Sequence, residues 1–282
     1  MLKNITKQSQ KYQQRLTSAI QIRKTRFNAQ SVQHHYTDAT LISHFLTALS
    51  ITFPQGERFF VETVRNVRDQ IEDPQLQADI SGFIGQEAHH AQAHEQFNAA
   101  VQSAQYNLKK YDAAFEKEML RLRTLTQRRQ LAATVALEHF TALMAGYMLK
   151  YPEFMFKGLS ANMKQLWLWH AVEEIEHKHV AFDVYQTIFN NLAQRRRSMR
   201  TISIGFISGT TMMTADLLWQ DRKQSLYQPV ELLKNIKALF GLTLMMVRLF
   251  PEYIAFYDED FHPKQLDQQE LLDMGRQLLN PN

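Results

Sequence analysis

The stretch LWHAVEEIEHKHVAFDVY, residues 168–185, decides the fold because its polar residues follow the period of an α-helix. At about 100° per residue, His170, Glu174 and His177 fall within about 60° of arc, stacked one turn apart. The rest of this stripe is apolar, so the three side chains point into the core. Burying them without partners is costly, and a cation compensates them directly. Three ligand-type side chains on one helix face therefore indicate a metal site.

A second helix, expected over residues 75–104, repeats this anomaly. Glu87 and His90 lie on a stripe with Phe83, Ile84 and other apolar residues at helical spacing. Their burial again requires a compensating charge. The two helices together would bring two Glu-x-x-His pairs to one interior.

Two residues are predicted to support the ligands by hydrogen bonds. His94 lies one turn beyond His90, where it is either a further ligand or a supporting group, and Glu173 lies at the edge of its stripe. Support of this kind is common because metal ligands need hydrogen-bonded partners. Glu176 and His179 are at other angles and are expected to face solvent.

Two more helices each contribute one inward acid. Glu57 shares a helix face with apolar residues, whereas Glu62 is turned away from it by about 140°. Glu138 lies among Leu131, Val135 and small alanines on the helix expected over 128–150. The chain order is then Glu, Glu-x-x-His, Glu, Glu-x-x-His, which is the arrangement of the di-iron and di-manganese carboxylate bundles. The alternative is that these residues are core polar groups satisfied by one another.

The composition favours an all-helical protein. The 282 residues include 9 Gly, 7 Pro and no Cys, and apolar residues recur at spacings of three and four. Without cysteine there is no disulfide framework, thiolate metal site or cysteine nucleophile. Pro54 is expected to end one helix and start the next. The predicted helices are 38–50, 55–71, 75–104, 112–125, 128–150, 161–193, 198–219, 229–257 and 265–279.

We divide the chain into three parts: a basic N-terminal arm (1–37), a helical core that carries the ligands (38–193) and a C-terminal helical extension (194–282). The arm contains seven Lys and Arg and no acid, which is typical of a solvated tail or of attachment to an anionic partner. We expect no nucleic acid partner and a cytoplasmic location, with peripheral membrane contact and a homodimer as further options. No apolar segment of a secretory signal follows the first charges.

Two apolar segments lie in the extension. Residues 201–219 are nearly uncharged and follow four arginines, a pattern that resembles a membrane span. Asp216, two glycines and several hydroxyl residues dilute the segment, so we predict a buried helix instead. The segment 238–247 is too short to span a membrane alone.

Five segments carry a family resemblance: FPQGERFF, FIGQEAHHAQAHEQFN, LEHFTALMAGY, LWHAVEEIEHKHVAFDVY and the late FHP at 261–263. They resemble a bacterial family of predicted metal-dependent hydrolases over roughly residues 40–265. That resemblance implies a ferritin-like four-helix bundle core with extra N- and C-terminal helices. The spacing of His170, Glu174 and His177 also resembles arylamine N-oxygenases, which add a third histidine to four Glu and two His. This second resemblance implies an O2-activating di-iron site and does not extend to the substrate.

The sequence therefore predicts two divalent metal ions, with iron favoured, manganese possible and zinc less favoured. We expect an oxygenase or oxidase that takes O2, an external electron donor and an apolar or amphipathic small molecule. The alternative is a two-metal hydrolase of an ester or phosphoester. A third possibility is a non-catalytic metal-binding bundle. The predicted ligands are Glu57, Glu87, His90, Glu138, His170, Glu174 and His177.

Overall fold

The computed structural model describes residues 20–24, 36–103 and 106–279. Within them every regular element is helical, so the all-α prediction is confirmed. The long helices are α2 (Thr40–Arg65), α3 (Pro74–Ser103), α4 (Lys109–Arg123), α5 (Gln127–Lys150), α7 (Ala161–His177), α8 (Val180–Ile188), α9 (Leu192–Gln220), α11 (Pro229–Ala255) and α12 (Gln269–Leu279). Short turns of helix are η2 (Arg68–Gln70), α6 (Pro152–Met155), α10 (Arg222–Ser225) and η3 (Pro263–Gln265).

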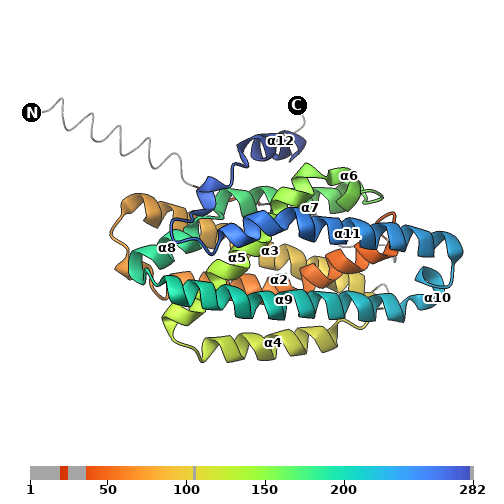
Figure 1. The fold of residues 1–282 in the computed structure, drawn as a ribbon, viewed down its shortest axis with the longest axis horizontal. Helices are drawn as coiled ribbons and strands as arrows, with labels where there is room; N and C mark the ends of the chain where they lie inside the picture. Colours follow the sequence, from red (N-terminus) through yellow and green to blue (C-terminus); the bar gives the residue numbers. More distant parts are fainter. Residues whose placement is uncertain (1–19, 25–35, 104–105, 280–282) are drawn as a thin grey trace, which may run out of the picture.

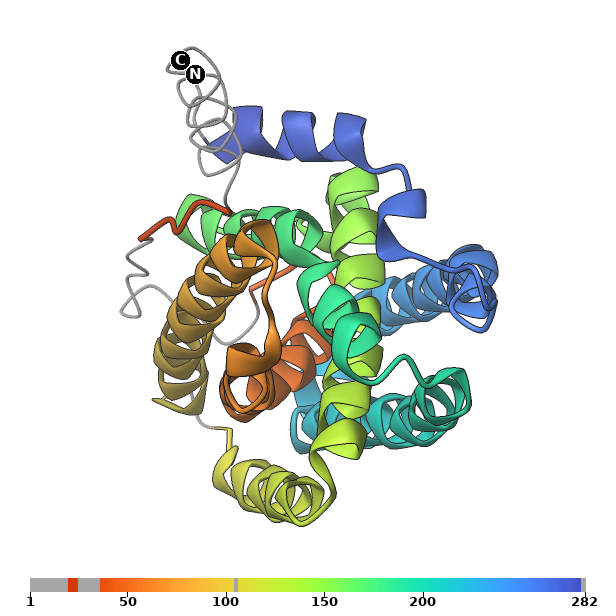
Figure 2. The ribbon, with the colours of Figure 1, turned by 90° about the vertical axis from the view of Figure 1, so that its left-hand side faces the viewer.

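Four helices form the central bundle. Helix α2 packs on α3, α5 packs on α7, and these two pairs face each other through α2 with α5 and α3 with α7. Viewed from the end, α5 runs through the middle, with α3 on one side and α9 and α11 on the other (Figure 2). The helical bundle agrees with the predicted fold class, while its ferritin-like assignment stays a prediction.

Helix α2 runs through Pro54 without ending, so the predicted boundary there is wrong. Proline has no N–H group to donate to the carbonyl of Ser50, four residues earlier. The side-chain amide of Asn98 on α3 supplies the missing donor, with Nδ2 3.0 Å from the Ser50 carbonyl oxygen. A tertiary contact therefore keeps the helix continuous, and one helix rather than two delivers Glu57 to the core.

Replacing Asn98 with Ala is expected to lower the free energy of unfolding by about 1–3 kcal/mol, because the buried Ser50 carbonyl then lacks a donor. In a Pro54→Ala background the restored amide at position 54 can pair with that carbonyl, so the loss should be smaller. Urea unfolding of the metal-free single and double variants measures the loss of unfolding free energy in each background. Equal losses in the two backgrounds would contradict this account of Pro54.

The predicted helix 161–193 is two helices. Helix α7 ends at His177 and α8 begins at Val180. Between them the Lys178 ammonium donates to the Leu266 carbonyl at 2.6 Å and to Gln268 Oε1 at 2.8 Å. These hydrogen bonds join Lys178 to a segment distant in sequence. They lie at the break between α7 and α8, directly after His177, the last predicted ligand.

The first apolar segment of the extension, residues 201–219, is more exposed than predicted. Helices α9 and α11 lie along the outside of the bundle against α2 and α5 (Figure 1). In residues 201–219 only one face is buried, at Ser203, Thr210, Thr214 and Leu217, so a fully buried helix is wrong there. Among the described residues, one helix, Pro229–Ala255, is long enough and apolar enough to cross a membrane. The segment 238–247 is part of this longer helix.

Of the predicted basic arm, residues 1–19 and 25–35 lie outside the described part of the chain. Residues 20–24 lie against α3, where Gly82 and Gly85 leave room for Ile20 and Ile22. A Cβ atom at either glycine would overlap these isoleucines. This part of the arm is therefore packed on the bundle. The three-part division of the chain stays a prediction.

Candidate metal centre

The structure brings all seven predicted ligands together in the middle of the bundle. Helix α2 contributes Glu57, α3 the Glu87 and His90 pair, and α5 Glu138; each side chain is at most 2% exposed. Helix α7 contributes the remaining three. The ligand atoms form two groups, and within each group they lie within 4.8 Å of one another. One group is Glu57, His90 and His170, and the other is Glu87, Glu138, Glu174 and His177.

Glu174 lies between the two groups. Its Oε1 atom is 3.2 Å from His170 Nε2, 3.4 Å from His90 Nδ1 and 3.7 Å from His177 Nε2. Glu87 has a similar place, with Oε1 2.9 Å from His177 Nε2 and 3.7 Å from His90 Nδ1. Each carboxylate thus reaches histidines of both groups, which is the position a bridging ligand requires.

Hydrogen bonds orient two of the ligand histidines, His177 and His90. His177 Nδ1 lies 2.8 Å from Gln86 Oε1, and because an amide oxygen only accepts, Nδ1 carries the proton and Nε2 offers its lone pair to the site. His90 Nε2 lies 3.0 Å from Glu173 Oε2, so its Nδ1 faces the site. Glu173 therefore has the supporting contact that the sequence predicted.

A chain of three hydrogen bonds orients the third ligand histidine, His170. The Ser50 hydroxyl donates to Asn98 Oδ1 at 2.7 Å, so its oxygen accepts from His94 Nδ1 at 2.8 Å. His94 Nε2 then has a free lone pair and accepts from His170 Nδ1 at 3.1 Å. His170 Nε2 is left to face Glu174. His94 acts on a ligand in this arrangement, which favours the supporting role over the ligand role.

Aromatic rings close the site on three sides. Phe53 stacks on His170 with centroids 4.7 Å apart, Trp169 meets His90 edge-on at 4.7 Å, and Phe83 meets His177 edge-on at 5.0 Å. None of the four principal cavities formed by the described residues is lined by any of the seven ligands. The ligands are therefore enclosed by neighbouring side chains and open onto none of these cavities.

Most of the inward-facing ligand atoms lack hydrogen-bond partners, although they are fully buried. Both carboxylate oxygens of Glu57, Glu87 and Glu138 are in this state, as are His90 Nδ1 and His177 Nε2. A buried polar atom without a partner costs about 1–3 kcal/mol, and more if it is charged. So many unpartnered acceptors converging on one interior fit divalent cations.

The electrostatics show what replaces the cations in the metal-free protein. Burial, reinforced by the charge of Glu87, raises the pKa of Glu57 and Glu138 well above the usual range. Burial acts to lower the pKa of His90 and His177, but the surrounding carboxylates outweigh it and raise both pKa values well above the usual range. The metal-free site therefore retains protons on groups that would ligate metal.

The sequence analysis missed several residues around the ligands. Glu176 and His179 were expected in solvent, but Glu176 accepts a two-pronged hydrogen bond from Arg23 at 2.6 and 2.7 Å, and His179 is only 9% exposed. Arg23 also lies 3.2 Å from Glu173. Gln86 links Glu176, at 3.1 Å, to His177. Gln86 could have been found from the sequence, because it is a polar residue on a buried helix face. No feature of the sequence indicated the role of Arg23.

Glu173→Gln is expected to weaken metal binding about 10- to 100-fold, because a charged acceptor no longer holds His90 in its ligating orientation. Arg23→Ala should have a smaller effect in the same direction, since it leaves Glu173 buried without its cation. Lys24→Ala is the matched control, because Lys24 is a neighbouring, exposed cation. Competition with a fluorescent chelator measures the affinities. An effect of Lys24→Ala as large as that of Arg23→Ala would contradict this role.

The fold and the site define a class: an all-helical protein whose core holds a carboxylate and histidine cluster suited to divalent cations. Residues 21–267 match the profile of the family described as predicted metal-dependent hydrolase, and the chain belongs to that family. The comparison with curated proteins and the comparison with solved structures gave no match. The family description agrees with metal dependence and with the hydrolase alternative, and it does not mention oxygenase activity.

Proposed function

We propose that the protein binds two divalent cations at this site and activates O2 to oxidise an apolar small molecule. The observation that carries the proposal is a cluster of seven ligand residues from four helices, each at most 4% exposed. An apolar reactant loses less hydration on entering such an interior than a charged phosphoester does. The aromatic rings of Phe53, Phe83 and Trp169 also favour an apolar reactant over a charged one.

The charges of the ligands support two cations. Four carboxylates carry four negative charges when ionised, and two divalent ions neutralise them without a large cost of charge burial. A mixed set of carboxylate and imidazole suits iron or manganese. When bound, two ferrous ions supply the two electrons that reduce O2, and an external donor must replace them.

The protein's own residues prepare this chemistry. Glu174 and Glu87 hold the two groups at a short separation, and the partners Gln86, Glu173 and His94 keep the imidazole lone pairs aimed inward. The rigid orientation lowers the reorganisation that binding requires. Burial of the ligands separates the reacting groups from bulk solvent, which limits side reactions.

The test is anaerobic loading with Fe(II), followed by rapid mixing with oxygenated buffer. We expect stoichiometric O2 consumption and a visible charge-transfer band that forms and decays, and neither in His177→Ala. Iron bound at about two per chain with no O2 consumption beyond that of free Fe(II) would contradict the proposal.

Hydrolysis is the second candidate, because the family description names it. Two cations can lower the pKa of a bound water and stabilise the negative charge of the intermediate. Turnover of nitrophenyl esters or phosphates by the zinc- or manganese-loaded protein, lost in His177→Ala, would favour it. Metal binding without either activity would favour the non-catalytic bundle.

A further inference from the structure

An apolar stripe runs along the outer face of α11. Its side chains share one face of the helix, interrupted by Thr243, and are 46% to 72% exposed: Ile236, Leu239, Phe240, Met246, Val247 and Phe250. The neighbouring helix α9 also exposes Ile204 and Ile207, at 71% and 39%. Continuous exposed apolar surface of this extent marks an interaction site in a monomer.

An apolar cavity of about 810 Å³ lies between α9 and α11, next to this stripe. Phe140, Leu143 and Met144 of α5 line it on the side of the bundle. Leu239 and Phe250 belong both to the stripe and to the cavity lining, so the two form one apolar surface. This cavity is on the face of α5 opposite Glu138 and is distinct from the metal centre.

Helix α11 is fastened to the bundle along its inner side. Asn235, 4% exposed, accepts from the Leu41 amide at 2.9 Å and donates to the Ser225 carbonyl at 3.0 Å. Near its start Glu231 accepts from the Thr40 amide at 3.0 Å. A helix held by buried polar bonds on one side cannot cross a bilayer without breaking them. It can lie in the interface plane with its apolar face immersed.

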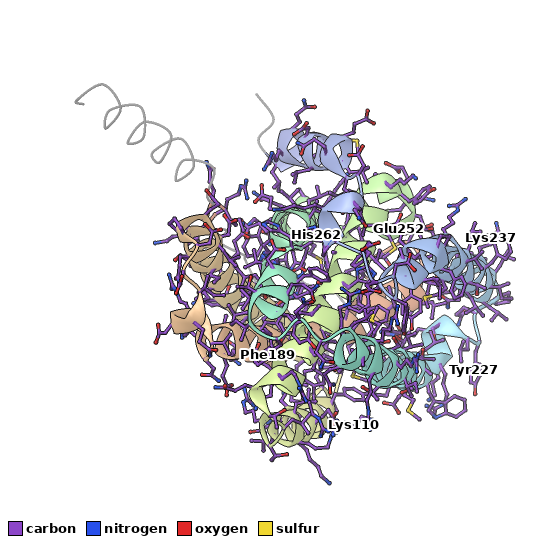
Figure 3. The ribbon with its side chains drawn as sticks, turned by 60° about the vertical axis from the view of Figure 1, so that its left-hand side comes forward. Lys110, Phe189, Tyr227, Lys237, Glu252 and His262 are labelled. Atoms are coloured by element: carbon purple, nitrogen blue, oxygen red, sulfur yellow. The ribbon has the colours of Figure 1, made fainter. Side chains whose placement is uncertain are left out.

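The charge of this face fits an anionic surface. Residues 192–255 contain nine Lys and Arg against four Asp and Glu. Arg200, Lys237 and Arg248 are exposed, and none of the three has an ion pair with another described residue. Figure 3 shows Lys237 at the outer edge of α11. The exposed acids Asp258, Glu259 and Asp260 come after the helix and lie beyond the stripe. Two copies pairing through this face would bring like charges together, which disfavours a symmetric dimer.

We infer that the α9 and α11 face docks on an anionic phospholipid bilayer, with the α11 stripe immersed among the acyl chains. The cations at its margin contact the lipid phosphates, and the cavity between the helices accepts an acyl chain. This docking does not depend on the chemistry of the metal centre.

The test is flotation of the full chain with vesicles of phosphatidylcholine, with and without phosphatidylglycerol. We expect flotation with the anionic vesicles, weakened by salt. Phe240→Asp with Val247→Asp should reduce the partition coefficient about tenfold or more, because two apolar side chains lose their burial. Leu120→Asp on α4 is the matched control, since Leu120 is 56% exposed on another helix. Lys237→Glu with Arg248→Glu should abolish the preference for anionic lipid.

Three results would overturn the inference. One is no flotation of the unaltered protein at low salt. Another is equal flotation of the Phe240→Asp, Val247→Asp variant, provided that its circular dichroism shows the native helix content. The third is a dimer in light scattering, without vesicles, that the same two substitutions dissociate, because a second copy would then cover this face.

Discussion

Glu174→Ala is expected to reduce bound metal from about two cations per chain to fewer than about half of one, the largest effect of any single substitution. Glu174 Oε1 lies within 3.2 to 3.7 Å of the ring nitrogens of three histidines from both ligand groups. If two cations bind, Glu174 is placed to hold both of them, so its removal would take a negative charge from both positions. Glu87 also reaches both groups, but through two histidines rather than three. The other five ligands each belong to one group, so the loss of any of these six should leave more residual binding.

Elemental analysis after anaerobic loading and desalting measures this content. Glu62→Ala is the control, because Glu62 is on α2 with Glu57 but pairs with Arg123 at 2.7 Å outside the core. It should retain the full metal content. Unchanged metal in Glu174→Ala would mean that the seven residues are merely core polar groups, and both enzymatic proposals would fail.

Removing metal is expected to lower the melting temperature by roughly 10–20 °C when free metal exceeds the dissociation constant about 100-fold. Each site then adds about 2.7 kcal/mol by mass action. For a domain of this size, about 1 kcal/mol corresponds to roughly 2–4 °C. The difference in melting temperature between loaded and chelated protein should also grow as pH rises from about 6.5 to 8.

The direction of this pH dependence follows from the raised pKa values. His90, His177, Glu57 and Glu138 bind protons more tightly in the metal-free folded protein than in the unfolded chain. Their stabilising contribution is full below the unfolded pKa and is lost as pH rises through the folded pKa. Over the same pH range, protons compete less with metal for the ligands, so the metal-loaded protein gains stability relative to the metal-free protein. Lys178, with a pKa lowered to about 8 by burial, adds stability to loaded and chelated protein alike above that pH, so it does not change their difference.

Differential scanning fluorimetry of loaded and chelated protein across this pH range measures the effect. The Glu174→Ala variant serves as control and should show almost no metal-dependent change at any pH. A difference that shrinks with rising pH would contradict the proposed competition between protons and cations.

Helical periodicity was enough to find the candidate ligands. The Glu-x-x-His spacing and the apolar stripes of two helices identified which charged residues face inward, and the structure brings all seven predicted residues together. Periodicity failed where a distant partner overrides local preference. Asn98 carries α2 past Pro54, and contacts from Leu266 and Gln268 accompany the break after His177.

The amino-acid sequence by itself determined the helical class and which side chains share a buried face, because both depend on residues three or four positions apart. Only the tertiary structure decided which nitrogen of each histidine faces the site, that Arg23 reaches Glu173, and that α11 leaves an apolar face uncovered. These features depend on contacts between segments dozens to more than a hundred residues apart, such as Arg23 with Glu173 and His94 with His170. Local spacing carries no information about such contacts.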